Sequence, residues 1–145
     1  MNPDFVALLR ELTATETRFM VVGAYALAHH ARPRATGDLD VWVEPTPENA
    51  ARVHAALRAF GAPLADLSVE ELSQPELVYQ IGVVPRRIDI LTTLTGITFS
   101  EAWQTRVVGP FGDTSCAFLG RAQLIQNKRA LGRPRDLADL EALGE

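Results

Sequence analysis

The segment TGDLDVWVEP constrains the fold most, because it places two aspartates inside a stretch that otherwise has the composition of a β-strand. Side chains alternate between the two faces of a strand, so Asp38 and Asp40 point to the same face. The opposite face carries only the apolar side chains of Leu39, Val41 and Val43. The two carboxylates would lie roughly 6–7 Å apart at Cβ. They repel each other, and each resists ionisation unless a cation lies nearby.

A D-x-D pair alone has a simpler explanation, in which Asp38 ends a loop and Asp40 is solvated at a sheet edge. A third aspartate favours a cation-binding site over this simpler explanation. The segment RRIDIL predicts a strand with Asp89 on one face and Ile88 and Ile90 on the other, and a carboxylate within an apolar strand is unfavourable without a partner. If the two strands are neighbours, the three carboxylates converge. Such a cluster would hold two Mg²⁺ ions about 3.5–4 Å apart, as in phosphoryl and nucleotidyl transfer.

A turn that would bind phosphate is predicted in VVGAYAL, where a short buried strand is followed by Gly23 and then by helix-forming residues. Free amides at the start of a helix favour an anion, and glycine lets a phosphate approach the backbone closely. A plain turn remains the alternative. Gly23 precedes Asp38 by 15 residues, which is enough for one short helix and a loop that returns to an adjacent strand.

The order of predicted elements indicates an α+β fold, in which helices cover a small mixed β-sheet. Helix, strand, helix, strand and helix are followed by several short strands and then by two C-terminal helices. These last helices are the segments RAQLIQNKRAL and RPRDLADLEAL, separated by Gly132. The length of 145 residues predicts a single domain over 1–145, with a helical tail over about 120–145.

Composition limits the classes of partner. The net charge of −4 makes the whole molecule a poor electrostatic match for nucleic acid, although local basic groups are present. Arg32 and Arg34 lie in the loop before the first two aspartates, and Arg86 and Arg87 precede the third. They predict a basic rim around an acidic centre, with a solvated loop as the alternative. A second basic group is expected in the tail helices: Arg121, Arg129, Arg133 and Arg135.

The sequence predicts a cytoplasmic protein with no membrane partner. The longest uncharged run, from Phe19 to Ala31, has 13 residues, which is too short to span a bilayer. The amino-terminal segment has charges among its apolar residues, which is typical of an amphipathic helix rather than a signal peptide. The single cysteine, Cys116, excludes a disulfide within the chain.

Together, the segments GAYALAHHARPRATGDLDVWV and RRIDIL resemble the DNA polymerase β-type nucleotidyltransferase superfamily. That superfamily has a glycine and a small residue, then D-x-D on a strand, then a third aspartate on a later strand. The tail NKRALGRPRDLADLEAL is similar to the small bacterial branch of the superfamily, akin to abortive-infection and type IV toxin–antitoxin nucleotidyltransferases. The resemblance covers residues 19 to 44, 85 to 93 and 120 to 143.

This resemblance implies specific roles for the aspartates. Asp38 and Asp40 would bind two Mg²⁺ ions. Asp89 would complete the catalytic metal site and is also a candidate general base. The three are therefore both the predicted metal ligands and the predicted catalytic residues.

The same resemblance implies a nucleotide site with an NTP as co-substrate. Gly23 and Ala24 would meet the phosphates, and Lys128, the only lysine in the chain, would contact them from the tail. Asp136 would orient Lys128 or close the pocket. The chain departs from the superfamily at Ala24, where serine or glycine is common, so a serine hydroxyl contact to phosphate is missing.

The function implied is transfer of an NMP from an NTP to a hydroxyl acceptor on RNA such as tRNA, on a protein, or on a small molecule such as an aminoglycoside. A toxin–antitoxin role would add a cognate antitoxin as partner, and a homo-oligomer is a further expectation. Two alternatives stay open. One is a degenerate, non-catalytic module that binds a nucleotide or a partner, and the other is a metal-dependent phosphodiesterase that uses the same carboxylates.

Overall fold

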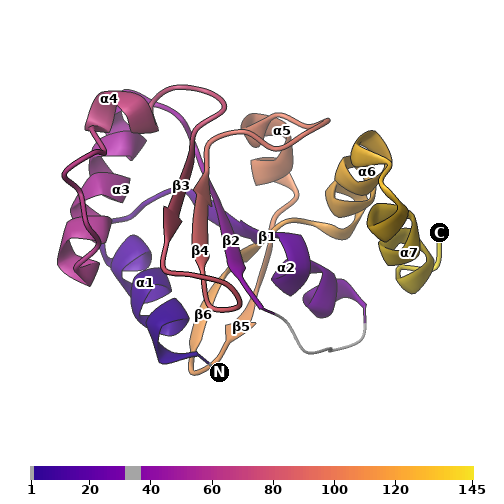
Figure 1. Ribbon diagram of the computed structural model, residues 1–145. Helices are drawn as coiled ribbons and strands as arrows, with labels where there is room; N and C mark the ends of the chain where they lie inside the picture. Colours follow the sequence, from indigo (N-terminus) through magenta and orange to yellow (C-terminus); the bar gives the residue numbers. More distant parts are fainter. Residues whose placement is uncertain (1, 32–36) are drawn as a thin grey trace.

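The strands form one mixed sheet, as the sequence predicts, in a computed structural model that describes residues 2–31 and 37–145 (Figure 1). The strand order is β3-β4-β2-β1-β6-β5 in this part of the chain. The strands are β1 Phe19–Val22, β2 Leu39–Val43, β3 Val78–Ile81, β4 Ile88–Leu91, β5 Val107–Phe111 and β6 Thr114–Phe118. β1 is antiparallel to β2 and parallel to β6, while β2 is parallel to β4. Antiparallel pairs, β3 with β4 and β5 with β6, form the two edges.

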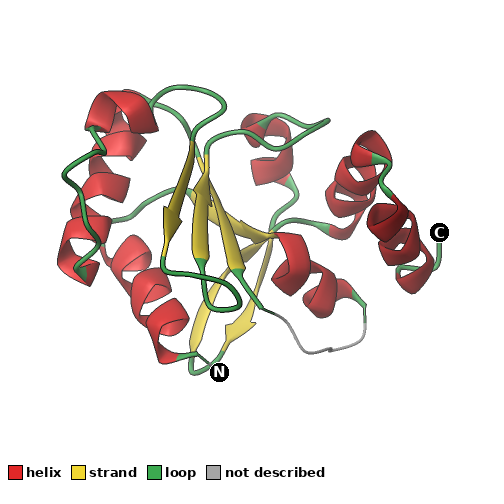
Figure 2. Ribbon diagram, in the orientation of Figure 1, coloured by secondary structure: helices red, strands yellow, loops and turns green. Residues whose placement is uncertain are grey.

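Helices cover both faces of the sheet (Figure 2). They are α1 Pro3–Ala14, α2 Gly23–His30, α3 Pro47–Phe60, α4 Val69–Leu72, α5 Phe99–Gln104, α6 Arg121–Leu131 and α7 Pro134–Ala142. In Figure 1, α1, α3 and α4 lie on one side of the sheet, and α2, α5, α6 and α7 on the other. The α+β class and the two C-terminal helices agree with the prediction.

Local sequence signals explain where several helices begin and end. The Asn2 side chain accepts a hydrogen bond from the Asp4 amide at 2.8 Å and caps α1, and Thr46 caps α3 in the same way. Ser68 forms a capping box with Glu71 at the start of α4. These bonds satisfy amides that the first helical turn leaves without partners.

Each face of the sheet has its own hydrophobic core. Leu39, Val41 and Val43 of β2 pack with α1, α3 and α4 in the first core, as the alternation of β2 predicts. The second core lies under α2, α5, α6 and α7 and contains Trp42 from β2. Leu124 of α6 also belongs to this second core, so the tail packs against the same face that carries the even-numbered residues of β2. In the described residues, none of the helices has the length and apolar composition needed to cross a bilayer.

Candidate functional site

Asp40 and Asp89 lie side by side in the sheet. They are direct partners in the parallel pairing of β2 with β4, so their side chains leave the same face. Their carboxyl groups are close enough to share a hydrogen bond. The condition set by the sequence, that these two strands are neighbours, is met, and the pairing places two of the three predicted aspartates side by side.

Asp38 joins this pair through Arg87. The Arg87 amide donates to Oδ1 of Asp38 at 2.8 Å, and Nη2 of Arg87 lies 3.5 Å from the other oxygen of Asp38. The same guanidinium donates from Nε to Oδ1 of Asp89 at 2.8 Å and from Nη2 to Oδ2 at 3.2 Å. Asp38, Asp40, Asp89 and Arg87 are called the carboxylate cluster below. The expectation that Arg87 lies on a rim is corrected, because its guanidinium lies inside the cluster.

The carboxylate cluster has more negative charge than its own cation compensates. Among the described residues, three carboxyl groups lie beside one guanidinium. Burial, together with the neighbouring Asp89 and Asp38 carboxylates, raises the pKa of Asp40 to about 7, while Arg87 acts in the opposite direction. In the part of the chain that the structure describes, Arg87 is the cation that acts on Asp40, and it offsets only part of this increase in pKa.

The donor set fits Mg²⁺, which prefers carboxylate oxygens as ligands. In residues 2–31 and 37–145, no group of three or more acidic, histidine or cysteine side chains is arranged to hold a metal ion as it stands. Arg87 contacts both oxygens of Asp89 and both oxygens of Asp38. Carboxylate groups that could bind an ion are therefore present, and the Arg87 guanidinium contacts two of them.

Gly23 lies against the carboxylate cluster at the turn that follows the adjacent strand β1. It follows β1 directly and has φ +64°, a left-handed conformation that favours glycine. A Cβ at this position would overlap Oδ2 of Asp40 and lie 3.0 Å from its Cγ. Among the described residues, no side chain caps the start of α2, so its first amides have no side-chain acceptor. Gly23 is therefore required both for the turn and for the close approach of Asp40.

One cavity of about 420 Å³ brings most of the predicted nucleotide-binding residues together. Its walls come from the β1–α2 turn, from β2 and from the tail helices, which are distant in sequence. The residues that matter for its chemistry are Gly23, Ala24, Asp40, Lys128, Arg133 and Asp139. Volumes of this size accommodate small-molecule ligands and cofactors. Asp38, Asp89 and Asp136 do not line it.

Lys128 lines this cavity and belongs to a group of two cations and two carboxylates in the tail helices. Its Nζ lies 3.0 Å from Oδ2 of Asp139 and 3.4 Å from Oδ1 of Asp136. Asp136 is fully buried and accepts hydrogen bonds from the backbone amide, Nε and Nη2 of Arg133. These bonds lower the pKa of Asp136 to about 2, and the charge of Lys128 contributes in the same direction. Lys128, Arg133, Asp136 and Asp139 are called the tail cluster below.

Asp136 was expected to orient Lys128 or to close the pocket, and the structure shows an ion pair between the two side chains at 3.4 Å. Asp139, the carboxylate closer to Lys128, was not predicted from the sequence. The signal was available, because Asp136 and Asp139 are three residues apart on a helix and therefore share a face. The same spacing argument would have placed both near Lys128 once the two tail helices were packed together.

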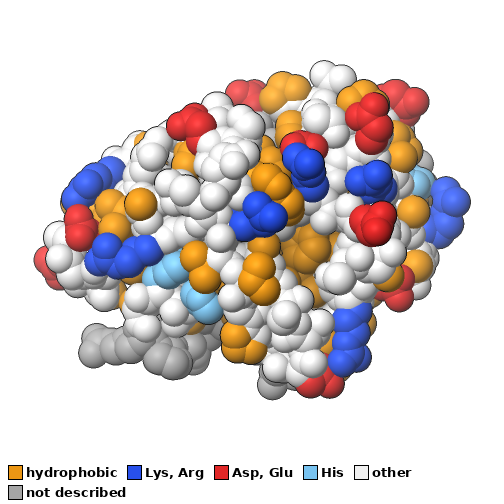
Figure 3. Space-filling view, turned by 180° about the vertical axis from the view of Figure 1, so that it is seen from behind, with side chains coloured by type: hydrophobic (Ala, Val, Ile, Leu, Met, Phe, Trp, Pro, Cys, Tyr) orange, Lys and Arg blue, Asp and Glu red, His pale blue; other side chains and the backbone are white. Residues whose placement is uncertain are grey.

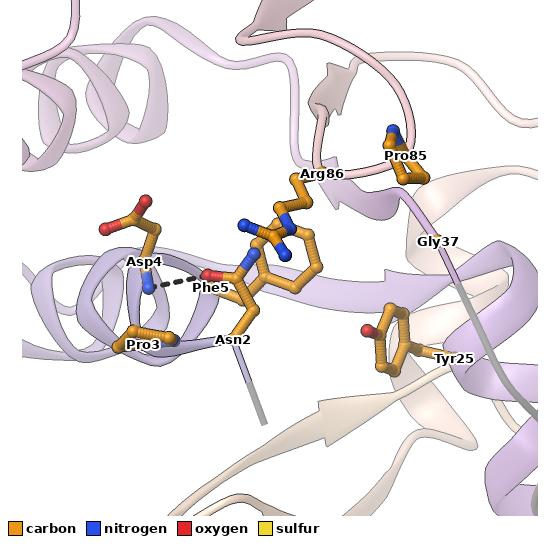
Figure 4. Close-up of a pocket in the computed structure, with 8 residues that line it drawn as sticks. All are labelled: Asn2, Pro3, Asp4, Phe5, Tyr25, Gly37, Pro85 and Arg86. Atoms are coloured by element: carbon orange, nitrogen blue, oxygen red, sulfur yellow. Dashed lines mark hydrogen bonds between the residues drawn. The ribbon is translucent and has the colours of Figure 1, made fainter.

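A larger cavity, of about 590 Å³, lies between the start of α1, α2 and the β3–β4 loop (Figure 4). It is lined by Phe5, Tyr25, Gly37 and Arg86 among others. None of the predicted site residues lines it. Size alone would favour this cavity, but the converging carboxylates and the lysine favour the smaller one as the candidate site.

The expected basic groups are only partly present as free cations. Arg32 and Arg34 lie outside the described residues. In the tail, Arg121 and Arg129 form ion pairs with Glu145 at 3.6 and 2.9 Å, while Arg135 lines the smaller cavity. On the face seen in Figure 3, acidic and basic side chains are interspersed, with hydrophobic side chains between them.

No known protein-family model matches this chain, and no curated protein is significantly similar to it in sequence. The resemblance to nucleotidyltransferases therefore rests on the sequence motifs alone.

Proposed function

We propose that the protein is a magnesium-dependent nucleotidyltransferase that moves an NMP from an NTP to a hydroxyl acceptor. The observation that carries this proposal is the convergence of Asp38, Asp40 and Asp89 around Arg87, the single guanidinium that the described residues place among them. Further support comes from the position of Asp40 in the wall of a cavity that also contains Gly23 and Lys128. Hard oxygen donors beside a phosphate-sized anion site are what this reaction needs.

In this proposal each residue has a defined task. The carboxylates of the cluster hold the cations, and the amides that follow Gly23 bind the phosphates. Lys128 presents its ammonium to the nucleotide, and Asp136 and Asp139 fix its position. Bound Mg²⁺ would lower the pKa of the acceptor hydroxyl and neutralise the leaving pyrophosphate. The bond from the acceptor oxygen to the α-phosphorus forms as the bond to pyrophosphate breaks, and Asp89 or solvent takes the hydroxyl proton.

The acceptor belongs, in this proposal, to one of three classes: RNA such as tRNA, a protein side chain, or a small molecule with a free hydroxyl. A regulatory antitoxin or a second copy of the chain is proposed as partner. The reaction would take place in the cytoplasm, where NTPs and Mg²⁺ are abundant.

A non-catalytic binding module is the second candidate function. Two observations favour it: Arg87 already neutralises part of the carboxylate cluster, and Ala24 offers no hydroxyl to a phosphate. Such a module would bind a nucleotide equally well with and without Mg²⁺. The proposed enzyme would bind it more tightly with Mg²⁺ and would release pyrophosphate.

The decisive assay incubates the full chain with each α-labelled NTP, Mg²⁺, and total RNA, total protein or an aminoglycoside. The proposal expects labelled product in one of these fractions. Asp40→Asn should reduce the rate by at least about a thousandfold, because the transition state loses electrostatic stabilisation. Asp113→Asn is the matched control, since Asp113 is exposed and its only described ion-pair partner is Arg10. Absence of pyrophosphate release with every NTP and acceptor would contradict the enzyme.

A further inference from the structure

We propose that the Arg87 guanidinium is an internal counter-cation of the carboxylate cluster, and that a divalent cation binds by displacing it from Asp89 and Asp38. Arg87 would thus be a positioning residue that keeps the carboxylates assembled before the cation arrives. The inference rests on the proposed function only in assigning the cation to these carboxylates.

The contacts of Arg87 are the first part of the argument. Its Nε and Nη2 bind the two oxygens of Asp89 at 2.8 and 3.2 Å, which is the bidentate geometry that arginine and carboxylate prefer. Nη2 also lies 3.5 Å from Oδ2 of Asp38. One guanidinium therefore bridges two carboxylates that would otherwise repel each other.

Simultaneous binding is unfavourable for two reasons. A divalent ion coordinates carboxylate oxygens at about 2.0–2.1 Å for Mg²⁺, so it needs the oxygens of Asp89 that Arg87 already contacts. It would also place two further positive charges within a few ångströms of the guanidinium, and this repulsion is large in a partly buried site. The side chains of Asp89 and Asp38 are only 11% and 20% exposed.

The backbone around Arg87 allows the side chain to leave without loss of the strand pairing. The Arg87 amide donates to Asp38 and its carbonyl accepts from the Leu39 amide at 2.9 Å, and neither bond involves the guanidinium. The Arg87 side chain is 28% exposed and follows an exposed loop, so solvent lies within its reach. The guanidinium can therefore exchange with a cation while Asp38 stays fixed by the backbone.

A consequence follows for cation affinity. Because the bound cation must replace the bonds that Arg87 makes, affinity in the absence of nucleotide is kept low. Removal of the guanidinium would raise this affinity and would destabilise the cation-free protein, since the carboxylates would lose their only described counter-cation. A side chain that merely supported the fold would have the opposite effect on affinity, because damage to the site weakens binding.

The test measures Mn²⁺ binding to the EDTA-treated full-length protein by electron paramagnetic resonance, without any nucleotide. Arg87→Met removes the charge but keeps much of the length of the side chain, and Arg86→Met is the matched control at the adjacent exposed arginine. Arg87→Met should bind Mn²⁺ about tenfold more tightly than wild type, since a neighbouring positive charge is removed. Arg86→Met should bind as wild type does. Thermal unfolding of cation-free Arg87→Met should occur at lower temperature and recover with Mn²⁺.

Arg87→Lys gives a second measurement in case Arg87→Met fails to fold. Lysine keeps the charge but loses the bidentate geometry, so Mn²⁺ affinity should rise by a smaller factor. Equal or weaker Mn²⁺ binding in the folded variants would overturn the inference and leave the proposed enzyme intact. No Mn²⁺ binding by wild type and variants, with or without an NTP analogue, would overturn both.

Discussion

Two aspartates on the same side of the sheet, Asp40 and Asp136, have pKa values shifted in opposite directions. The pKa of Asp40 is raised to about 7 by burial and by the adjacent carboxylates, whereas hydrogen bonds from Arg133 lower the pKa of Asp136 to about 2. The difference lies in their partners. Within residues 2–31 and 37–145, the tail cluster has two cations for two carboxylates, and the carboxylate cluster has one cation for three carboxyl groups.

We interpret the tail cluster as structural and, under the proposed function, the carboxylate cluster as functional. A balanced cluster stabilises the packing of α6 against α7 and holds Lys128 in place. An unbalanced cluster costs stability in the isolated protein, and the proposed function supplies an external cation to complement it. Perturbed carboxyl groups of this second kind concentrate at functional sites. This comparison is tested by substitutions in the two clusters, which should change the free energy of unfolding in opposite directions.

The largest effect on stability is expected in the tail cluster. Asp136→Asn should lower the free energy of unfolding at pH 6 by about 3 kcal/mol, because Lys128 and Arg133 lose a buried ionised partner. Chemical denaturation measures this directly. Asp113→Asn, at an exposed ion pair, should change stability by less than about 0.5 kcal/mol. A similarly small change in Asp136→Asn would mean that the tail cluster does not stabilise the fold.

A smaller effect of opposite sign is expected in the carboxylate cluster. The raised pKa of Asp40 means that the folded protein binds this proton more tightly than the unfolded chain. Its contribution to stability is complete below the ordinary pKa of 3.8 and is lost as pH rises through about 7. In EDTA at pH 8, Asp40→Asn should therefore be more stable than wild type by about 2 kcal/mol.

This gain in Asp40→Asn should shrink as pH is lowered toward 5, where the wild-type carboxyl group is protonated in the folded state. Denaturation curves at the two pH values test the sign. If Asp40→Asn is less stable than wild type at pH 8, then Asp40 is already well compensated and the contrast between the clusters is wrong.

The smallest effect is the loss, at acidic pH, of the stability that Asp136 contributes to the tail cluster. Because the pKa of Asp136 is lowered, its contribution is present above 3.8 and is lost as pH falls through about 2. The stability difference between wild type and Asp136→Asn should therefore narrow from pH 5 to pH 3. The effect is modest, since only the first part of this titration lies where the protein can be studied folded. A difference independent of pH would contradict the assignment.

The elements of the fold were predictable because local signals mark them. Caps at Asn2, Thr46 and Ser68 start helices, and Gly132 separates the two tail helices as the sequence indicates. The pairing of β2 with β4 is not a local signal. It was inferred from chemistry, since the Asp89 carboxylate in an apolar strand needed partners.

The parts that were not predicted depend on side-chain geometry. Arg87 and Asp89 are two residues apart and therefore share a face of the strand, but spacing alone does not say that the guanidinium turns inward onto Asp38 as well. Asp139 was missed because its importance depends on the angle at which α7 packs on α6. The larger cavity joins Phe5, Tyr25 and Arg86, which no sequence pattern relates to one another.

The most direct test of the central claim is anomalous diffraction from crystals of the protein grown with Mn²⁺ and a non-hydrolysable NTP analogue. The proposal predicts an anomalous peak within coordinating distance of the Asp40 and Asp89 carboxylates, with the guanidinium of Arg87 turned away and the analogue's phosphates beside Gly23. A bound analogue with no peak at these carboxylates, and with Arg87 still bridging Asp38 and Asp89, would contradict it.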